Sequence, residues 1–174
     1  MCIRDSSEPG ALISVTLGGV THQAVTNGAG VWQSFFSASE IAPGTYDADI
    51  TATTTDAAGN TATVTDTVHV DTQVDNLSVA ASTVETDGIV SGAEQSDGVV
   101  LTGTTEVGSS VSVTLGSETV QAIVDANGNW QAPFAASQIP LGEYEANISV
   151  TATDVAGNVA TAVSYTHLTL PTKA

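Results

Sequence analysis

The stretch Gly142–Thr153, GEYEANISVTAT, decides the fold of this chain. Its apolar residues, among them Tyr144, Ile148 and Val150, occupy every second position, and polar residues stand between them. Successive side chains of a strand point to opposite faces of a sheet, so this period of two is typical of a half-buried antiparallel strand. The sequence therefore predicts one long strand with an apolar face toward a core and a polar face toward solvent.

The same pattern occurs 98 residues earlier, as GTYDADITATTT at Gly44–Thr55. With that offset, Glu8–Thr63 aligns with Glu106–Thr161 without a gap, and about half of the 56 paired positions are identical. Solenoid repeats are only roughly 20–50 residues long, so this repeat is a whole domain copied in tandem. Each copy, at roughly 100 residues, is large enough to bury a core of its own.

Shorter alternating segments surround the long strand, and turn sequences such as DANGN (Asp125–Asn129) separate them. Strands are expected over Leu77–Ser82, Ile89–Val90, Val99–Thr105, Ser110–Leu115, Glu118–Val124, Trp130–Phe134, Glu143–Thr153 and from Val159 onward, with an acidic connection over Glu85–Gly98. About seven short antiparallel strands per copy indicate an immunoglobulin-like sandwich, and Tyr46 and Tyr144 stand where a tyrosine corner would lie. The predicted fold class is all-β, with tandem immunoglobulin-like antiparallel β-sandwiches.

The two ends of the chain are predicted to be non-native. MCIRD, at the start, can be encoded by a DNA sequence whose reverse complement encodes VSYTH, which begins at Val163. The two ends resemble translated sequencing-adapter DNA. We therefore expect non-native segments at residues 1–6 and 163–174, a partial repeat lacking its first strands at residues 7–71, and a nearly complete repeat at residues 72–162.

The charge balance excludes several classes of function. The formal net charge is −17, and the two basic residues, Arg4 and Lys173, both lie in the predicted end segments, as does Cys2. Nucleic acid is not expected as a partner, because few groups could neutralise phosphates. Direct insertion into a membrane is not expected. The part of the chain between the two end segments has no cysteine, so it has neither disulfides nor thiol chemistry.

The segments TDGIVSGAEQSDGVVLTGT (Thr86–Thr104), VSVTLG (Val111–Gly116), NGNW (Asn127–Trp130) and GEYEANISVTATDVAGN (Gly142–Asn158) resemble the bacterial immunoglobulin-like repeats of very large, biofilm-associated or type I-secreted surface adhesins. This resemblance implies a structural spacer, or stalk, at the bacterial cell surface or outside the cell. It implies neighbouring repeats as partners, calcium at domain junctions, and no direct contact with a host or surface ligand.

Strand order brings several acidic residues to one end of the second copy. The linker residues Asp71 and Asp75, the loop residue Glu106, and Asp154 and Asn158 of the D-x-A-G-N turn are the candidate calcium ligands. Calcium takes about six to eight oxygen ligands, including carboxylates and carbonyls, at flexible spacing. The alternative is that Asp154 only caps its own turn and that the linker acids are solvated. A second group, Asp87, Glu94 and Asp97, is a weaker candidate for a further junction.

No catalytic motif is found, so the chain is not expected to be an enzyme. His22 and His69 are predicted to be exposed strand residues, and DANGN to be a hairpin turn instead of the start of an EF-hand loop. The aromatic pairs Trp32/Trp130 and Phe36/Phe134 recur at matching positions, which favours core anchors. The alternative function, an accessory carbohydrate-binding module of an extracellular enzyme, would require such aromatics to be exposed.

Overall fold

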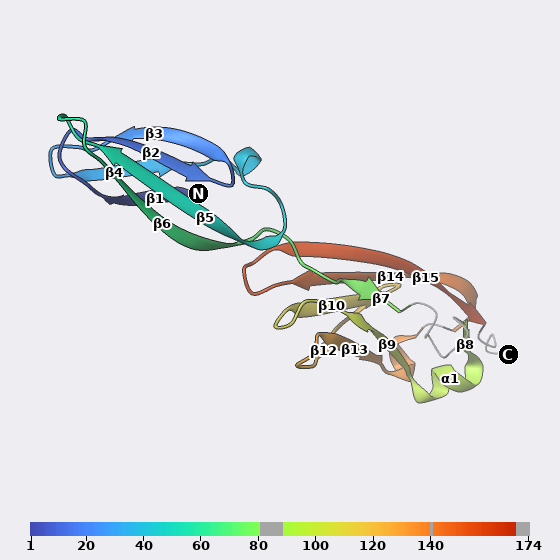
Figure 1. Ribbon diagram of the computed structural model, residues 1–174. Helices are drawn as coiled ribbons and strands as arrows, with labels where there is room; N and C mark the ends of the chain where they lie inside the picture. Colours follow the sequence, from blue (N-terminus) through green and yellow to red (C-terminus); the bar gives the residue numbers. More distant parts are fainter. Residues whose placement is uncertain (81–88, 140, 170–174) are drawn as a thin grey trace. The chain divides into compact units, whose positions relative to one another are not determined.

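The computed structural model describes residues 1–80, 89–139 and 141–169, and the regular secondary structure of these residues is almost entirely β-strand (Figure 1). The chain divides into two compact units, Met1–Thr72 (unit 1) and Gln73–Ala174 (unit 2), and each has its own hydrophobic core. The all-β, immunoglobulin-like fold class is confirmed.

Unit 2 is a sandwich of two sheets, with strand orders β11-β10-β14-β15-β8 and β12-β13-β9-β7. Its elements are β7 (Ser78–Val79), β8 (Ile89–Ser91), α1 (Gly92–Asp97), β9 (Val99–Thr104), β10 (Ser110–Leu115), β11 (Glu118–Gln121), β12 (Ile123–Val124), β13 (Asn129–Phe134), η3 (Ala136–Gln138), β14 (Glu143–Thr153) and β15 (Val159–Thr169). The bounds of β10 and β14 agree with the prediction at both ends. The predicted strand Leu77–Ser82 is described only as far as residue 80.

Two strand predictions were wrong in detail. The expected single strand Glu118–Val124 is divided at Ala122, so that β11 pairs with β10 in one sheet and β12 pairs with β13 in the other. The strand β8 runs parallel to β15, so the sandwich is not wholly antiparallel. Parallel neighbours need a long crossover connection, and here most of unit 2 lies between the two strands in sequence.

The acidic connection Glu85–Gly98 contains the short helix α1, which was not predicted. The Ser91 hydroxyl accepts a hydrogen bond from the Glu94 backbone N–H at 3.4 Å, and the Glu94 carboxylate accepts one from the Ser91 N–H at 2.8 Å. This reciprocal pair is a capping box, whose S-x-x-E signature is visible in the sequence. Gly98, with a φ of 88°, ends the helix.

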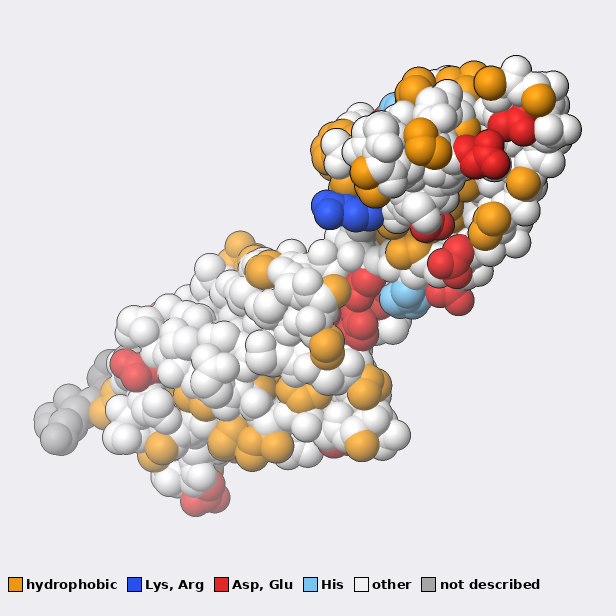
Figure 2. All heavy atoms as spheres, turned by 90° about the vertical axis from the view of Figure 1, so that its left-hand side faces the viewer, with side chains coloured by type: hydrophobic (Ala, Val, Ile, Leu, Met, Phe, Trp, Pro, Cys, Tyr) orange, Lys and Arg blue, Asp and Glu red, His pale blue; other side chains and the backbone are white. Residues whose placement is uncertain are grey.

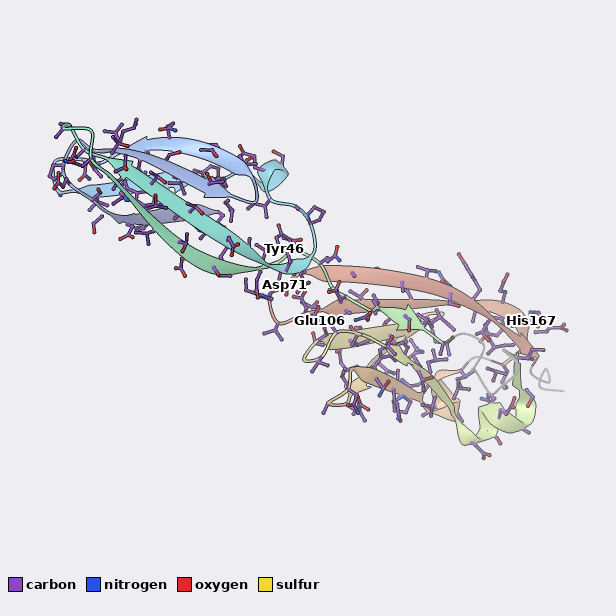
Figure 3. The ribbon with its side chains drawn as sticks, in the orientation of Figure 1. Tyr46, Asp71, Glu106 and His167 are labelled. Carbon is purple, nitrogen blue, oxygen red and sulfur yellow. The ribbon has the colours of Figure 1, made fainter. Side chains whose placement is uncertain are left out.

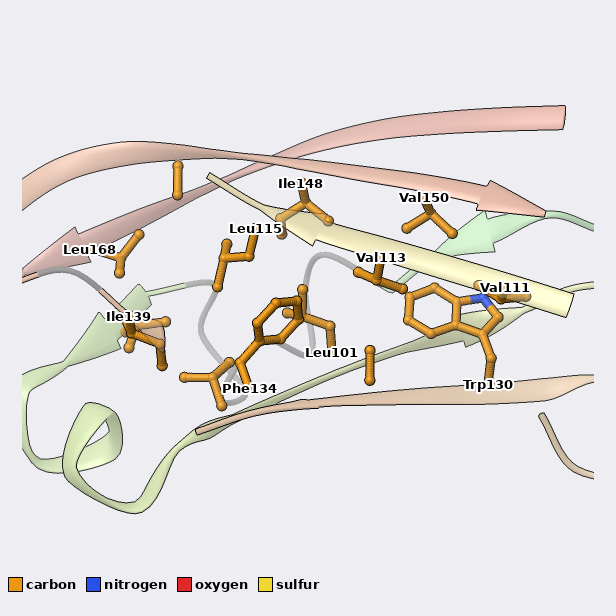
Figure 4. Packing of buried hydrophobic residues seen from close by; sticks show 14 of the residues in the cluster. Leu101, Val111, Val113, Leu115, Trp130, Phe134, Ile139, Ile148, Val150 and Leu168 are labelled. Carbon is orange, nitrogen blue, oxygen red and sulfur yellow. The ribbon is translucent and has the colours of Figure 1, made fainter. Parts of the chain in front are cut away.

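The core of unit 2 lies between its two sheets (Figure 4). The predicted inward set of β14 is confirmed, since Ala146, Ile148, Val150 and Ala152 are all buried. The Trp130 ring is fully buried opposite these residues, and its indole N–H donates to the carbonyls of Ser78 and Thr104. The recurring tryptophan of unit 2 is therefore a core anchor.

Unit 1 repeats this architecture with fewer strands. Its sheets have the orders β3-β2-β5-β6 and β1-β4. The elements are β1 (Cys2–Ser6), β2 (Leu12–Leu17), β3 (Val20–Val25), β4 (Val31–Phe35), η1 (Ala38–Glu40), β5 (Thr45–Thr55) and β6 (Thr61–Asp71). The Tyr46 hydroxyl donates to the Ala42 carbonyl at 2.9 Å, which confirms the tyrosine corner in this unit.

The two end segments occupy strand positions. In unit 1, β1 pairs with β4 in the register Ile3↔Ser34, which matches Leu101↔Ala132 of β9 and β13 at the 98-residue offset. In unit 2, the segment from Val163 to Thr169 continues β15 along β14 as β6 continues along β5. Both end segments therefore form strands of the fold. Their non-native origin stays a prediction.

Candidate metal-binding pole of unit 2

Asp154 lies in the turn between β14 and β15 and is only 6% exposed. Its carboxylate accepts hydrogen bonds from the Asn158 backbone N–H at 2.8 Å and from the Asn158 side-chain amide at 2.8 Å. Burial alone would raise the pKa of Asp154, but these bonds and those from the Gly157 and Ala156 backbone hold it below its ordinary value. Asp154 is therefore an ionised carboxylate at neutral pH.

The turn itself is not specific to a binding site. Asp56 and Asp125 make the same hydrogen bonds to Asn60 and Asn129, which likewise hold their pKa values low. The prediction that DANGN is a hairpin turn is confirmed, since it joins β12 and β13. These three aspartates share one capping geometry, so only additional neighbours can make Asp154 a ligand.

Such neighbours are present in unit 2. A carboxylate oxygen of Glu106, in the β9–β10 loop, lies within 4.8 Å of one from Asp154. Glu106 also accepts a hydrogen bond from the Asp75 backbone N–H at 3.2 Å, so the linker residue Asp75 is tied to the same loop. We call Asp75, Glu106, Asp154 and Asn158 the acidic pole.

Two buried hydroxyls flank Glu106. Thr105 is 4% and Ser109 6% exposed, and among the described residues neither hydroxyl has a hydrogen-bond partner. In unit 1 the Thr105 counterpart, Ser7, is paired with the Thr54 hydroxyl at 2.9 Å, but Ala152 replaces that threonine in unit 2. A buried polar group without a partner costs about 1–3 kcal/mol. Two hydroxyls without a described partner therefore lie within three residues of Glu106 in the sequence.

The remaining candidate ligands have different surroundings. Asp71 ends β6 of unit 1, where it accepts a hydrogen bond from the Thr45 hydroxyl at 3.4 Å. Figure 3 shows Asp71 near Tyr46 at one end of unit 1, and Glu106 and His167 at opposite ends of unit 2. In the second predicted group, Glu94 serves as the cap of α1, and Asp87 lies outside the described residues.

Both histidines lie on strands, and the prediction that they are exposed is confirmed for His69 but wrong for His22. His22 is partly buried, its ring contacts that of Phe36 edge-on at 4.7 Å, and its Nε2 lies 2.8 Å from Glu40. His69 Nδ1 lies 2.7 Å from Asp47 on the exposed face of unit 1. Hydrogen bonds from the Ser37 side chain, the Ser37 backbone and His22 lower the pKa of Glu40 to about 2. These pairs stabilise local structure. On the face shown in Figure 2, acidic side chains occur at several separate places.

The recurring aromatics are confirmed as core anchors, since Trp32, Phe36, Trp130 and Phe134 are at most 5% exposed. They form no exposed platform of the kind that a carbohydrate would stack on. In the part of the chain that the structure describes, no helix combines the length and apolar character needed to cross a membrane.

Comparisons with known proteins agree with this fold. Residues 88–168 match the family described as bacterial Ig domain. A structure of a 1.5-MDa bacterial ice-binding adhesin is 26% identical over 96% of this chain and 56% of that chain, with a TM-score of 0.52. A Ca2+-stabilised adhesin of an Antarctic bacterium is 24% identical over 96% of this chain and 43% of that chain (TM-score 0.48). An immunoglobulin-like domain of the M. primoryensis ice-binding adhesin is 29% identical over 56% of this chain and 95% of that chain (TM-score 0.38).

No curated protein sequence matches this chain significantly. The chain spans about half the length of the first two adhesin structures that it matches. Residues 88–168 are similar to bacterial immunoglobulin-like domains, and the resemblance to the repeats of large bacterial adhesins is confirmed.

Proposed function

We propose that this chain is a spacer segment of a bacterial cell-surface or secreted adhesin, stiffened by calcium between its repeats. The single observation that carries the proposal is structural repetition. The long strand pairs β5–β6 and β14–β15 share one register at the 98-residue offset, and each unit has its own core. Tandem domains with separate cores add length to a chain without requiring a binding site in each copy.

The similarity to an ice-binding adhesin over 96% of this chain supports the same assignment. Catalysis is not part of the proposal, because hydrogen bonds within the turns of Asp56, Asp125 and Asp154 lower the pKa of each carboxyl, whereas a general acid needs a raised pKa. The expected partners are neighbouring repeats of the same chain. Nucleic acid is not expected, because the net charge is −17.

The acidic pole supports calcium as the stiffening ion. Glu106 and Asp154 can offer carboxylate oxygens, Asn158 and Asp75 can offer further oxygens, and the orphan hydroxyl of Thr105 lies next to Glu106 in the chain. An oxygen-only set of this kind suits calcium, which accepts flexible geometry. A cation there would also offset the repulsion between two carboxylates within 4.8 Å of each other.

Asp71 is proposed as a ligand from the preceding repeat. Only four residue steps separate it from Asp75, so an extended chain could hold the two Cα atoms at most about 14 Å apart. An ion bound by Asp71 together with the acidic pole would restrict rotation at the linker. Calcium would then change bending stiffness without changing the fold of either unit.

The spacer function is tested by small-angle X-ray scattering of this chain with calcium and with a chelator. The expected result is a larger maximum dimension and a narrower distribution of lengths with calcium. Asp154→Asn should remove the difference, whereas Asp56→Asn, in the equivalent turn of unit 1, should keep it. A maximum dimension that is the same with calcium and chelator, for a chain that does bind calcium, would contradict stiffening.

A further inference from the structure

A short segment ties the entry of unit 2 to its second sheet. We call this segment, Asp75–Ala80, the strap, and it contains β7. Its first backbone N–H donates to the Glu106 carboxylate at 3.2 Å, and its last donates to the Thr102 carbonyl at 3.0 Å. Between them, the Thr104 hydroxyl donates to the Asn76 carbonyl at 2.8 Å. The strap is therefore held at both of its ends by β9 and by the loop that follows β9.

The middle of the strap is held by polar contacts more than by burial. The Ser78 hydroxyl lies 2.8 Å from the Thr104 hydroxyl, and the Ser78 carbonyl accepts a hydrogen bond from the Trp130 indole at 3.2 Å. Leu77 and Val79 pack against the core cluster but are only partly buried, and its fifteen buried residues all lie outside the strap. Segments with few buried apolar contacts open locally at low cost. The strap can therefore leave β9 while the core stays closed.

Tension along a series of repeats would enter unit 2 through the strap. The strand β9 ends at Thr104, next to the Glu106 loop, and β7 is antiparallel to it, so β7 runs away from the acidic pole. The strand β15 also runs away from this pole, to Thr169, and the matching strand β6 leads out of unit 1 at Asp71. Figure 3 shows Glu106 and His167, which lies near the end of β15, at opposite ends of unit 2. Tension between these ends therefore pulls the strap back along its own axis.

A second pair of strands would bear the load after the strap. The strand β8 runs parallel to the end of β15, in a register that includes Ile89↔His167 and Val90↔Leu168. Tension would draw the start of β8 toward the pole and the end of β15 away from it, which loads the hydrogen bonds of this pair together. Val90 and Leu168 are fully buried, and Val70, which matches Leu168 in β6, is buried as well. The β8–β15 pair is therefore embedded in the core, whereas the strap is not.

We propose that the strap is a tension-release element, which detaches from β9 under load while the rest of unit 2 stays folded. The β8–β15 pair then becomes the point at which tension enters the sandwich. Fourteen residue steps separate Asp75 from Ile89, so release lengthens the chain by less than about 50 Å. Only the source of the tension rests on the proposed spacer function. The strap adds to that function a limited, reversible extension that precedes any loss of the core.

The test holds the full chain by its two ends in magnetic tweezers, with chelator present, and records steps in length at constant force. Unit 2 should first lengthen by a reversible step of less than about 50 Å. A step of more than about 200 Å should follow, as the 80 residue steps from Ile89 to Thr169 unravel. Unit 1 should unfold in a large step of its own, because its compact part spans residues 1–72. The small step therefore identifies the strap.

Matched variants assign the small step. Thr104→Val keeps the branched shape of the side chain but removes the hydroxyl that contacts Asn76 and Ser78. It should make the small step about tenfold faster at a fixed force, because the strap loses hydrogen bonds that hold it. Thr114→Val removes another exposed hydroxyl, which pairs with that of Thr119 at 2.9 Å outside the strap. This control should leave the small step unchanged.

A third variant and two outcomes complete the test. Ala80→Pro removes the N–H that pairs with Thr102, and should accelerate the small step at least as much as Thr104→Val. Unfolding of wild-type unit 2 in one large step, without a small step before it, would overturn the proposal. So would equal acceleration by Thr104→Val and Thr114→Val. Because chelator is present throughout, these results are separate from the scattering test of calcium stiffening.

Discussion

Unit 1 and unit 2 are copies of one repeat and have the same strand register, but their hydrophobic cores differ in size. Among the described residues, fifteen buried side chains form the core cluster of unit 2 and eight form that of unit 1. Ile148 is fully buried, whereas its identical counterpart Ile50 is only half-buried. The difference follows from β7 and β8, which cover unit 2 and have no described counterpart in unit 1. Burial in this fold therefore depends on neighbouring strands as much as on the residue itself.

The largest difference in stability between the two units is expected from one substitution made at matching positions. Ile148→Ala should destabilise unit 2 by about 2–5 kcal/mol, because it leaves a cavity in a closed core. Ile50→Ala should cost unit 1 clearly less, since its site already opens toward solvent. Hydrogen exchange measured separately for the two units gives both values. Equal costs would show that the cores are equally closed.

A second test concerns the strand edge. Gly103→Ala should destabilise unit 2 by about 1–3 kcal/mol, because the added methyl group meets the Ser78 carbonyl and the Trp130 ring. Asp5→Ala, at the matching position of unit 1, should change stability by less than about 0.5 kcal/mol. Urea unfolding followed through tryptophan fluorescence measures both. If Gly103→Ala left stability unchanged, β7 would not lie along the edge of β9.

The smallest expected effect is the pH dependence that Glu40 adds to unit 1, since unit 2 has no acid at the matching position. Glu40 has a lowered pKa of about 2 through Ser37 and His22, whereas unit 2 has Gln138 and Val120 at the matching positions. Because the folded pKa lies below the ordinary value of 4.5, the stability that this carboxylate contributes is present above pH 4.5. It should be lost as the pH falls from about 4.5 to about 2.

The substitution Glu40→Gln copies unit 2 and should remove this part of the acid sensitivity of unit 1. Thermal melts between pH 2 and pH 5 provide the measurement. Glu118→Gln, an acid of unit 2 outside this cluster, serves as the control. If wild type and Glu40→Gln lost stability in parallel over that range, Glu40 would not be the responsible group.

The long strands and the core aromatics could be predicted because period-two alternation and 98-residue repetition are written directly in the sequence. The division of Glu118–Val124 at Ala122 could not, because both halves alternate alike and only their pairing partners differ. The α1 capping box was visible as Ser91 and Glu94, although the short acidic segment was interpreted as a loop. The helix shows that two capping residues can indicate a helix in a segment that is too short to show a helical periodicity.

Part of the candidate site could not be predicted from the sequence either. The turn chemistry of Asp154 was foreseen as an alternative, but not its burial or the orphan hydroxyls of Thr105 and Ser109. The Thr105 hydroxyl lacks a partner because one distant threonine is replaced by Ala152, which is a tertiary effect without a local signal. The partner of His22 likewise lies 18 positions away, at Glu40.

The measurement that tests the central claim most directly is a thermal melt of this chain with calcium and with chelator, for wild type, Asp154→Asn and Asp56→Asn. Calcium at a hundred times its dissociation constant should add about 2.7 kcal/mol to the stability of unit 2. The account predicts this gain in wild type and in Asp56→Asn, and its loss in Asp154→Asn. An equal gain in all three proteins would place the ion elsewhere, and no gain in wild type would contradict a calcium-stiffened spacer.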